Sequence, residues 1–199
     1  MSIAMENFER LHQRNEDPWG FRTRWYERRK RDLLTASLPR ERFASGWEMG
    51  CSNGELAAAL APRCDRLLVS DCSARAVVLA AERLADEPNA AVEQRELPGD
   101  WPEERFDLIV MSEIGYFLSE ADLECVVMKL RDSLTAEGVL IACHWRGPIE
   151  GYEIDGDETH ATLRHNLPWR VILEHVEDDF LMEGWSVDGV SVAKLEGLK

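Results

Sequence analysis

A glycine-containing turn at residues 48–54 could bind a ligand through its backbone. It follows a short apolar run and leads into a helical stretch. Glycine permits positive φ angles and a close approach of a ligand, and the N–H groups of the following helix can meet a carboxylate or phosphate. A dinucleotide site needs the spacing G-x-G-x-x-G, but those places hold Gly50, Ser52 and Glu55. Because an acid at Glu55 would oppose a pyrophosphate, the turn favours a phosphate-free ligand. The alternative is an ordinary structural turn.

A second candidate is Asp71, which stands 21 positions after Gly50 at the end of the next apolar run. An acid about 20 residues beyond such a turn typically accepts hydrogen bonds from ribose hydroxyls. The alternative is an acid at a helix N-terminus with Ser73 as its partner. The spacing favours the ribose role.

The elements that must position these residues alternate between strand and helix. Strands are predicted at 47–49, 67–70, 91–95, 108–111 and 139–144, followed by a closing pair at 169–177 and 180–187; helices are predicted at 56–60, 73–84, 119–134 and 157–167. This rhythm predicts a doubly wound, parallel α/β sheet. Ligands of such sheets bind beyond the carboxyl ends of the strands, so the residues after each strand are the candidates for chemistry.

Residues 1–45 differ from the rest because several arginines and Lys30 stand among aromatic residues. A helix is predicted at about 23–37, with Pro39 ending it. We expect an amphipathic helix with a solvated basic face rather than a direct ligand site, although it could close over a ligand as a lid, with Trp19 and Tyr26 in contact. The predicted division is therefore a helical extension at 1–45 and a main domain at 46–199.

The composition excludes several classes of partner. The 199 residues include 38 acidic and 23 basic side chains, which gives a net charge of −15. Such a chain repels phosphate backbones and anionic membranes, so we expect no nucleic-acid and no membrane partner. No apolar run approaches the ~20 residues of a membrane-spanning helix, and residues 1–14 lack an apolar signal core, so a soluble cytoplasmic protein is expected. Five scattered cysteines and the histidine spacing predict neither disulfides nor a metal site. The oligomeric state stays open.

Taken together, these motifs resemble the class I S-adenosylmethionine-dependent methyltransferases. The class-level resemblance is carried by Glu48-x-Gly50-x-x-x-Gly54, Asp71 and Phe106-Asp107-Leu108-Ile109-Val110. More narrowly, the chain resembles the NodS-like branch, named for an N-methyltransferase of nodulation-factor synthesis. That likeness is carried by Asn15-Glu16-Asp17-Pro18-Trp19, Trp25-Tyr26-Glu27-Arg28-Arg29-Lys30, Glu48-Met49-Gly50-Cys51-Ser52 and His144-Trp145-Arg146, and it extends from about residue 15 to residue 197. Ser52 departs from the glycine that is usual in the class.

The resemblance implies a Rossmann-like, mostly parallel seven-stranded sheet that binds S-adenosylmethionine and releases S-adenosylhomocysteine. It places Glu48 and Gly50 against the methionine part of the cofactor, Asp71 on the ribose, and Cys72 beside the adenine edge. Glu96 and Leu97 would lie near the adenine amino group, although Asp is more usual than Glu there. The implied cofactor-binding set is completed by Cys51, Gly54 and Ser112, with Trp19 and Tyr26 from the possible lid.

Methyl transfer from a sulfonium is an in-line displacement, in which the protein mainly positions and desolvates the reactants. An amine acceptor must also lose a proton, which suits a carboxylate or neutral imidazole. Glu113 and His144, each just past a central strand, are the candidate bases; a structural role for His144 is equally compatible with the sequence. His160 and His165 are expected at the surface, with a place in the acceptor pocket as the alternative for His160.

An aromatic wall could also hold a cationic acceptor beside Glu113. Tyr116 and Trp145 are the candidates, with core packing as the alternative for Tyr116. Arg146 could bind an acidic group of the acceptor, but a salt bridge to one of the many acids is slightly favoured.

The favoured function is S-adenosylmethionine-dependent methylation of a small molecule, with an amine nitrogen as the acceptor. The alternatives are a nicotinamide-dependent oxidoreductase, against which the glycine spacing and Glu55 speak, and a methyltransferase-like binding protein without catalysis. The intact Gly50, Gly54 and Asp71 speak against lost function.

Overall fold

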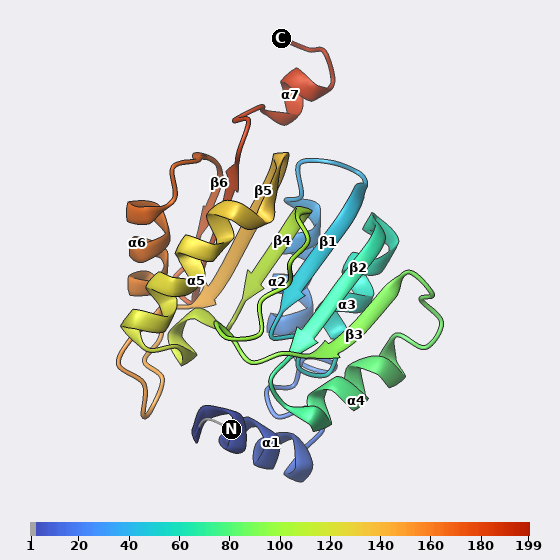
Figure 1. Cartoon of the computed structure of the whole chain (residues 1–199), viewed down its shortest axis with the longest axis vertical. Helices are drawn as coiled ribbons and strands as arrows, with labels where there is room; N and C mark the ends of the chain where they lie inside the picture. Colours follow the sequence, from blue (N-terminus) through green and yellow to red (C-terminus); the bar gives the residue numbers. More distant parts are fainter. Residues whose placement is uncertain (1–2) are drawn as a thin grey trace. The chain divides into compact units, whose positions relative to one another are not determined.

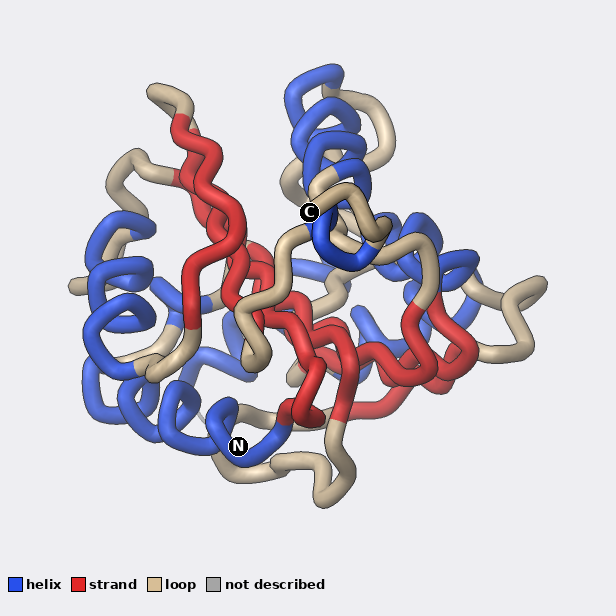
Figure 2. Tube along the Cα trace, turned by 90° about the horizontal axis from the view of Figure 1, so that it is seen from above, coloured by secondary structure: helices blue, strands red, loops and turns tan. Residues whose placement is uncertain are grey.

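The computed structural model describes residues 3–199, with side chains from residue 5 onward. Its strands form a seven-stranded sheet in the order β3-β2-β1-β4-β5-β7-β6. This is the doubly wound, mostly parallel α/β architecture that the sequence predicts. Contacts divide the chain into two compact units, residues up to 37 with 42–101, and residues 38–41 with 102–199. Figure 2 shows helices as blue coils beside the red strands that they cover.

The first unit is built on three parallel strands, in which β1 pairs with β2 and β2 with β3. α4 packs against β2 and β3, and α1 packs against α4 (Figure 1). In chain order its elements are α1 (Ile3–Arg14), α2 (Trp25–Ala36), β1 (Phe43–Met49), α3 (Glu55–Leu60), β2 (Cys64–Asp71), α4 (Ala74–Arg83) and β3 (Ala90–Gln94), with a 3-10 turn, η1 (Ala61–Arg63), after α3.

The core of the first unit explains why β1 and β2 are almost wholly buried. Trp47 is fully buried, its indole N–H donates to Ser70 Oγ at 2.9 Å, and its ring meets Trp101 edge-on. Ser73 caps the next helix, because its Oγ accepts from the N–H of Ala76 at 3.1 Å. Both features fix the carboxyl end of β2, where Asp71 lies.

The second unit carries the remaining four strands. β4 and β5 are parallel, whereas β7 runs antiparallel between β5 and β6. α5 and α6 contact each other, and α6 also contacts β5 and β7 (Figure 1). The elements are β4 (Phe106–Ser112), η2 (Gly115–Phe117), α5 (Glu120–Ser133), β5 (Leu134–Trp145), α6 (Gly156–Asn166), β6 (Arg170–Val176), β7 (Phe180–Ser186) and α7 (Val192–Leu195).

The structure confirms every predicted strand and adds elements that the sequence pattern missed. The helix predicted at about 23–37 is α2, but α1 was not predicted. β5 begins at Leu134 instead of after Gly138, since the chain passes from α5 into the strand without a turn. The division at residue 45 stays a prediction. Among the described helices, none is both long enough and apolar enough to cross a membrane.

Candidate functional site

The turn after β1 is a tight bend with three backbone positions in the left-handed region. Gly50, Ser52 and Gly54 have φ angles of 68°, 49° and 77°. A Cβ at Gly54 would lie 2.9 Å from Ala80 Cα, so glycine also permits the close approach of α4. The N–H of Cys51 donates to Ser70 O at 2.9 Å, which ties the bend to the end of β2.

Asp71 joins this bend to the start of α4. Its side chain is buried, Oδ2 accepts from the N–H of Ser52 at 2.9 Å, and Oδ1 accepts from the N–H of Ser73 at 2.9 Å. Burial raises the pKa of Asp71, and these two N–H groups oppose the rise without cancelling it. The sequence expectation of a carboxylate beside the bend is therefore met in geometry, and each oxygen retains capacity for a further donor.

Two buried oxygens at the bend lack a hydrogen-bond donor among the described residues: Glu48 Oε2 and Asn53 Oδ1. Glu48 is 2% exposed, and both its burial and the charge of Asp71 raise its pKa well above the ordinary value. Buried polar atoms are rarely left without partners. A ligand with N–H or ammonium donors would complete both groups.

The other predicted adenosine contacts follow β2 and β3 in the same unit. Cys72 is half-buried, and burial together with the charge of Asp71 raises the pKa of its thiol to about 12, so it is no nucleophile near neutral pH. Glu96 and Leu97 are half-buried in the loop after β3, where the N–H of Glu96 donates to Asp100 Oδ2 at 3.1 Å. Cys51 is buried, and its thiol pKa is raised well above the usual range, first by burial.

His12, which no sequence pattern indicated, holds α1 on the bend. Its Nδ1 lies 2.9 Å from Phe8 O, and its Nε2 lies 2.9 Å from Ser52 Oγ. Because a carbonyl only accepts, Nδ1 carries a proton that it donates to Phe8 O, and Nε2 forms its hydrogen bond with the hydroxyl of Ser52. The departure of Ser52 from glycine was the available signal, since a serine at positive φ needs compensation.

Further contacts dock the N-terminal segment on the same unit. Asn53 Nδ2 donates to Asp17 Oδ1 at 2.9 Å, and Glu9 Oε2 accepts from Ser73 Oγ at 2.8 Å. Trp19 lies in an aromatic cluster, with its ring centroid 5.6 Å from that of His12. Tyr26 is half-buried in α2 under the ammonium of Lys30. Whether Trp19 and Tyr26 contact a cofactor stays a prediction.

One argument from the sequence needs correction. Glu55 was expected to repel a pyrophosphate at the helix N-terminus, but its Oε1 is 3.0 Å from Arg83 Nε and 3.3 Å from Arg22 Nε. These two guanidinium groups balance its charge, so repulsion by Glu55 carries little weight. The glycine spacing remains the argument against a dinucleotide.

In the second unit, Glu113 follows β4 in a strained conformation, with φ at 59°. Ser112 precedes it, half-buried. The Oε2 atom of Glu113 accepts from the backbone N–H of Trp145 at 3.0 Å and from the hydroxyl of Tyr116. Non-glycine residues at positive φ gather at functional sites. The structure thus brings together three of the residues predicted to act on the acceptor.

His144 is fully buried and both ring nitrogens are engaged. Nε2 accepts from the N–H of Gly115 at 3.0 Å, and Nδ1 lies 3.0 Å from His160 Nε2. This arrangement favours the structural alternative over a role as base. The expectation of His160 at the surface was wrong, because it is fully buried, whereas His165 is exposed.

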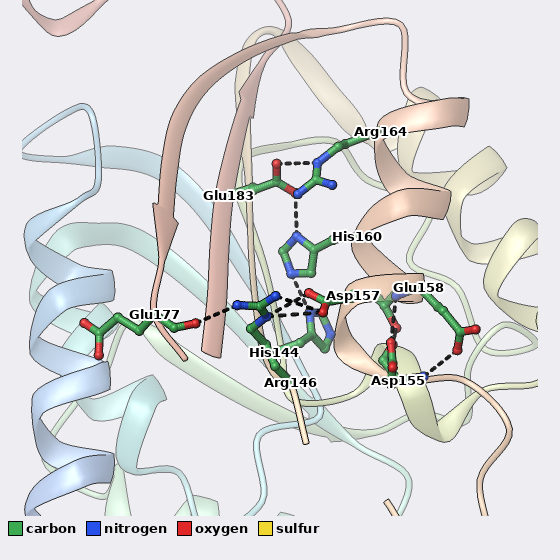
Figure 3. A network of polar contacts seen from close by, with 10 residues as sticks. His144, Arg146, Asp155, Asp157, Glu158, His160, Arg164, Glu177 and Glu183 are labelled. Atoms are coloured by element: carbon green, nitrogen blue, oxygen red, sulfur yellow. Dashed lines mark hydrogen bonds and ion pairs between the residues drawn. The ribbon is translucent and has the colours of Figure 1, made fainter. Parts of the chain in front are cut away.

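Arg146 forms the salt bridge that the sequence analysis slightly favoured. Its Nε lies 2.9 Å from Asp157 Oδ1, and its NH1 group donates to the carbonyl of Glu177 at 2.8 Å (Figure 3). Its charge is therefore already balanced within the chain, which weakens the case for substrate binding.

The profile of the family described as "Nodulation protein S (NodS)" matches residues 5–151. Nodulation protein S of Sinorhizobium fredii (strain NBRC 101917 / NGR234) is 28% identical over 141 residues, which cover 69% of this chain and 65% of that relative. The alignment thus spans less than two thirds of the relative's own length.

Two solved structures extend the likeness. A candidate methyltransferase from Pseudomonas syringae is 47% identical, with a TM-score of 0.74 over 82% of this chain and 99% of that one. N-methyltransferase NodS from Bradyrhizobium japonicum WM9, solved with S-adenosyl-L-homocysteine, is 23% identical, with a TM-score of 0.83 over 93% of this chain and 98% of that one. At 23% identity, the second likeness shows the shared fold.

Proposed function

The chain belongs to the nodulation protein S (NodS) family, and from that premise we propose that it methylates a small molecule with S-adenosylmethionine as donor. An amine nitrogen is the favoured acceptor. The observation that carries the proposal is the bend at residues 50–54, on which the carboxylate of Asp71 is held by the N–H of Ser52 beside the unpartnered oxygen of Glu48.

The residues present fit this cofactor. Asp71 would accept hydrogen bonds from the two ribose hydroxyls, and the open oxygen of Glu48 suits the ammonium of the methionine part. The G-x-G-x-x-G spacing of a dinucleotide site is absent, so an adenosyl ligand without a pyrophosphate fits better. When bound, S-adenosylmethionine supplies a methyl group that is already activated on a sulfonium.

The chain's own contribution to the reaction is to orient the acceptor and take its proton. We assign the proton to the carboxylate of Glu113, whose Oε2 is fixed by Tyr116 and by the backbone of Trp145. A fixed carboxylate within hydrogen-bond reach of an amine can act as a general base and can hold the amine as an ammonium before transfer. Tyr116 and Trp145 add aromatic surface for a cationic group.

The proposal is tested by incubating the chain with S-adenosylmethionine and a panel of amino alcohols, amino acids and amino sugars. Mass spectrometry should detect a methylated amine together with S-adenosylhomocysteine. Glu113→Gln should lower kcat by about 10²- to 10⁴-fold, because the amide cannot accept the proton. Binding of S-adenosylhomocysteine should be unchanged in this variant.

The matched control is Glu120→Gln, which removes an acid exposed on α5 and should leave kcat unchanged. Cofactor binding without any methylated product across the panel would contradict the proposal and favour a binding protein without catalysis.

A further inference from the structure

A line of polar side chains, buried except for Arg164 at one end, runs through the second unit (Figure 3). Arg164 Nε lies 2.6 Å from Glu183 Oε1, and Glu183 Oε2 lies 2.6 Å from His160 Nδ1. His160 Nε2 then lies 3.0 Å from His144 Nδ1. The two histidines and Glu183 are 0% exposed, so bulk water does not reach them. Such a buried chain is costly unless every member is satisfied.

The end of the line fixes the position of every proton along it. The backbone N–H of Gly115 can only donate, so His144 Nε2 accepts and its proton lies on Nδ1. His144 Nδ1–H then donates to Nε2 of His160, whose own proton lies on Nδ1 and is donated to Glu183. Both histidines are therefore neutral, and both carry the proton on Nδ1.

The other end is held by charge. Burial raises the pKa of Glu183, but the hydrogen bonds from His160 and Arg164 outweigh it, and the net pKa lies below the ordinary value. Glu183 thus remains a carboxylate that only accepts. Glu183 can only accept at one end of the line, and the Gly115 amide can only donate at the other. These two ends set the donor-to-acceptor direction of every hydrogen bond between them.

The turn at this end is closely packed. A Cβ added to Gly115 would lie 2.2 Å from Thr159 Cγ2 and 3.0 Å from His144 Nε2. Gly115 stands two residues after Glu113, which has the φ of 59°. It immediately precedes Tyr116, whose hydroxyl donates to Glu113. The hydrogen bond from Gly115 to His144 therefore anchors the short segment that determines where the Glu113 carboxylate points.

Two other roles for this line fail on its geometry. A proton relay needs an exchangeable acid at each end, but this line ends on a backbone amide. A metal site needs ligands around one centre, and no group of three or more His, Cys, Asp or Glu side chains is so placed within residues 3–199. Here each nitrogen and oxygen is hydrogen-bonded to the next member of the line.

We propose that His160 and Glu183 are positioning residues for the reaction: they hold His144 in the tautomer that accepts the Gly115 amide and so fix the segment carrying Glu113. This inference rests on the proposed role of Glu113. It assigns a functional reason to a carboxylate on β7 and a histidine on α6, neither of which would touch the reacting atoms.

The first test needs neither a variant nor an acceptor. Nitrogen-15 NMR of histidine-labelled chain should show His144 and His160 protonated on Nδ1 and unprotonated on Nε2. A proton on Nε2 of His144 would overturn the proposal, since Nε2 could then not accept from Gly115.

The second test uses a substitution that should reverse the direction of the hydrogen bonds along the line without creating a cavity. In Glu183→Gln the amide can offer an oxygen to Arg164 or to His160 but not to both, and Arg164 cannot give up its proton. The amide NH₂ should then face His160 and move the protons of both histidines to Nε2, where His144 would oppose the Gly115 amide. The NMR signal of the Gly115 amide should shift, and its proton should exchange faster with solvent.

Kinetics use the amine of the panel that the unaltered chain methylates fastest. Glu183→Gln should lower kcat about 100-fold, the effect expected of a displacement near 1 Å, with KM for S-adenosylmethionine unchanged. His160→Gln should retain the tautomers and kcat, because its amide accepts from His144 and donates to Glu183 as imidazole does. His160→Leu should lose the Nδ1 tautomer of His144 and should lower kcat as Glu183→Gln does.

The matched control is Glu174→Gln, which removes an exposed acid directly opposite Glu183 on β6 and should change nothing. Unchanged tautomers and kcat in Glu183→Gln would overturn the positioning role. If instead the tautomers reverse but the panel gives no methylated amine even with the unaltered chain, the line is as described and the proposed function is what fails.

Discussion

Asp71 uses one carboxylate to hold two backbone N–H groups from different loops, and the proposed ribose contacts depend on that arrangement. An isolated acid at the end of a strand would be free to rotate. Here the N–H groups of Ser52 and Ser73 fix both oxygens, so the remaining acceptor positions are oriented before any ligand arrives. Preorganisation of this kind lowers the ordering cost of binding.

Asp71→Asn should therefore weaken S-adenosylhomocysteine binding. The charged hydrogen bonds lost are worth about 1.5–3 kcal/mol, or ~10- to ~150-fold in Kd. Calorimetry measures the change. The control is Asp65→Asn, which alters an exposed acid at the other end of β2 and should keep the original Kd. Equal affinity in the two variants would refute the ribose assignment.

We expect Glu48 to make cofactor binding depend on pH. Its pKa is raised by burial and by Asp71, so the free chain holds a proton there above the ordinary carboxyl range. The folded chain binds this proton more tightly than the unfolded chain, so the stability contributed by Glu48 falls as pH rises toward the raised pKa. An ammonium placed beside Glu48 favours its ionised form, so ligand binding should release the proton.

S-adenosylhomocysteine affinity should accordingly increase with pH below the raised pKa of Glu48 and level off above it. Calorimetry in buffers of different ionisation enthalpy should detect the released proton. Glu48→Gln should abolish the release. Proton uptake on binding, or an affinity that falls as pH rises, would show that Glu48 does not meet the ammonium.

Among the elements, α1 shows where sequence reasoning stops. Its apolar residues Met5, Phe8 and Leu11 recur at helical spacing, but its position is fixed by contacts distant in sequence, such as that between His12 and Ser52. By contrast, the apolar runs of β4 and β5 are local signals, and the structure confirms the strands predicted from them. The bend and Asp71 were predictable from spacing; the line from Gly115 to Arg164 was not, because it joins four separate segments.

The contact between Ser52 and α1 makes a prediction about stability. Ser52 adopts a φ of 49°, which costs an L-residue about 1–2 kcal/mol. Ser52→Ala and Ser52→Gly both remove the hydrogen bond to His12, but glycine also relieves the backbone. The free energy of unfolding in urea should therefore be about 1 kcal/mol higher for Ser52→Gly than for Ser52→Ala.

The controls are Met128→Ala and Met128→Gly, at an exposed position of α5 with ordinary helical geometry. Here the alanine variant should have the higher free energy of unfolding, by about 1 kcal/mol. If the alanine variant were also the more stable one at position 52, Ser52 would not be strained.

For the molecule as a whole, the strand order places β7 antiparallel between β5 and β6, and Glu183, the acceptor at the head of the buried line, lies on β7. The net charge of −15 suits a neutral or cationic acceptor.

Calorimetry of the unaltered chain with S-adenosylhomocysteine, with NADH titrated in parallel, tests the central claim most directly. The bend after β1 and the carboxylate of Asp71 should give saturable binding of S-adenosylhomocysteine and none of NADH. Saturable binding of NADH without binding of S-adenosylhomocysteine would contradict the account. The absence of S-adenosylhomocysteine binding at high micromolar concentration would contradict it as well.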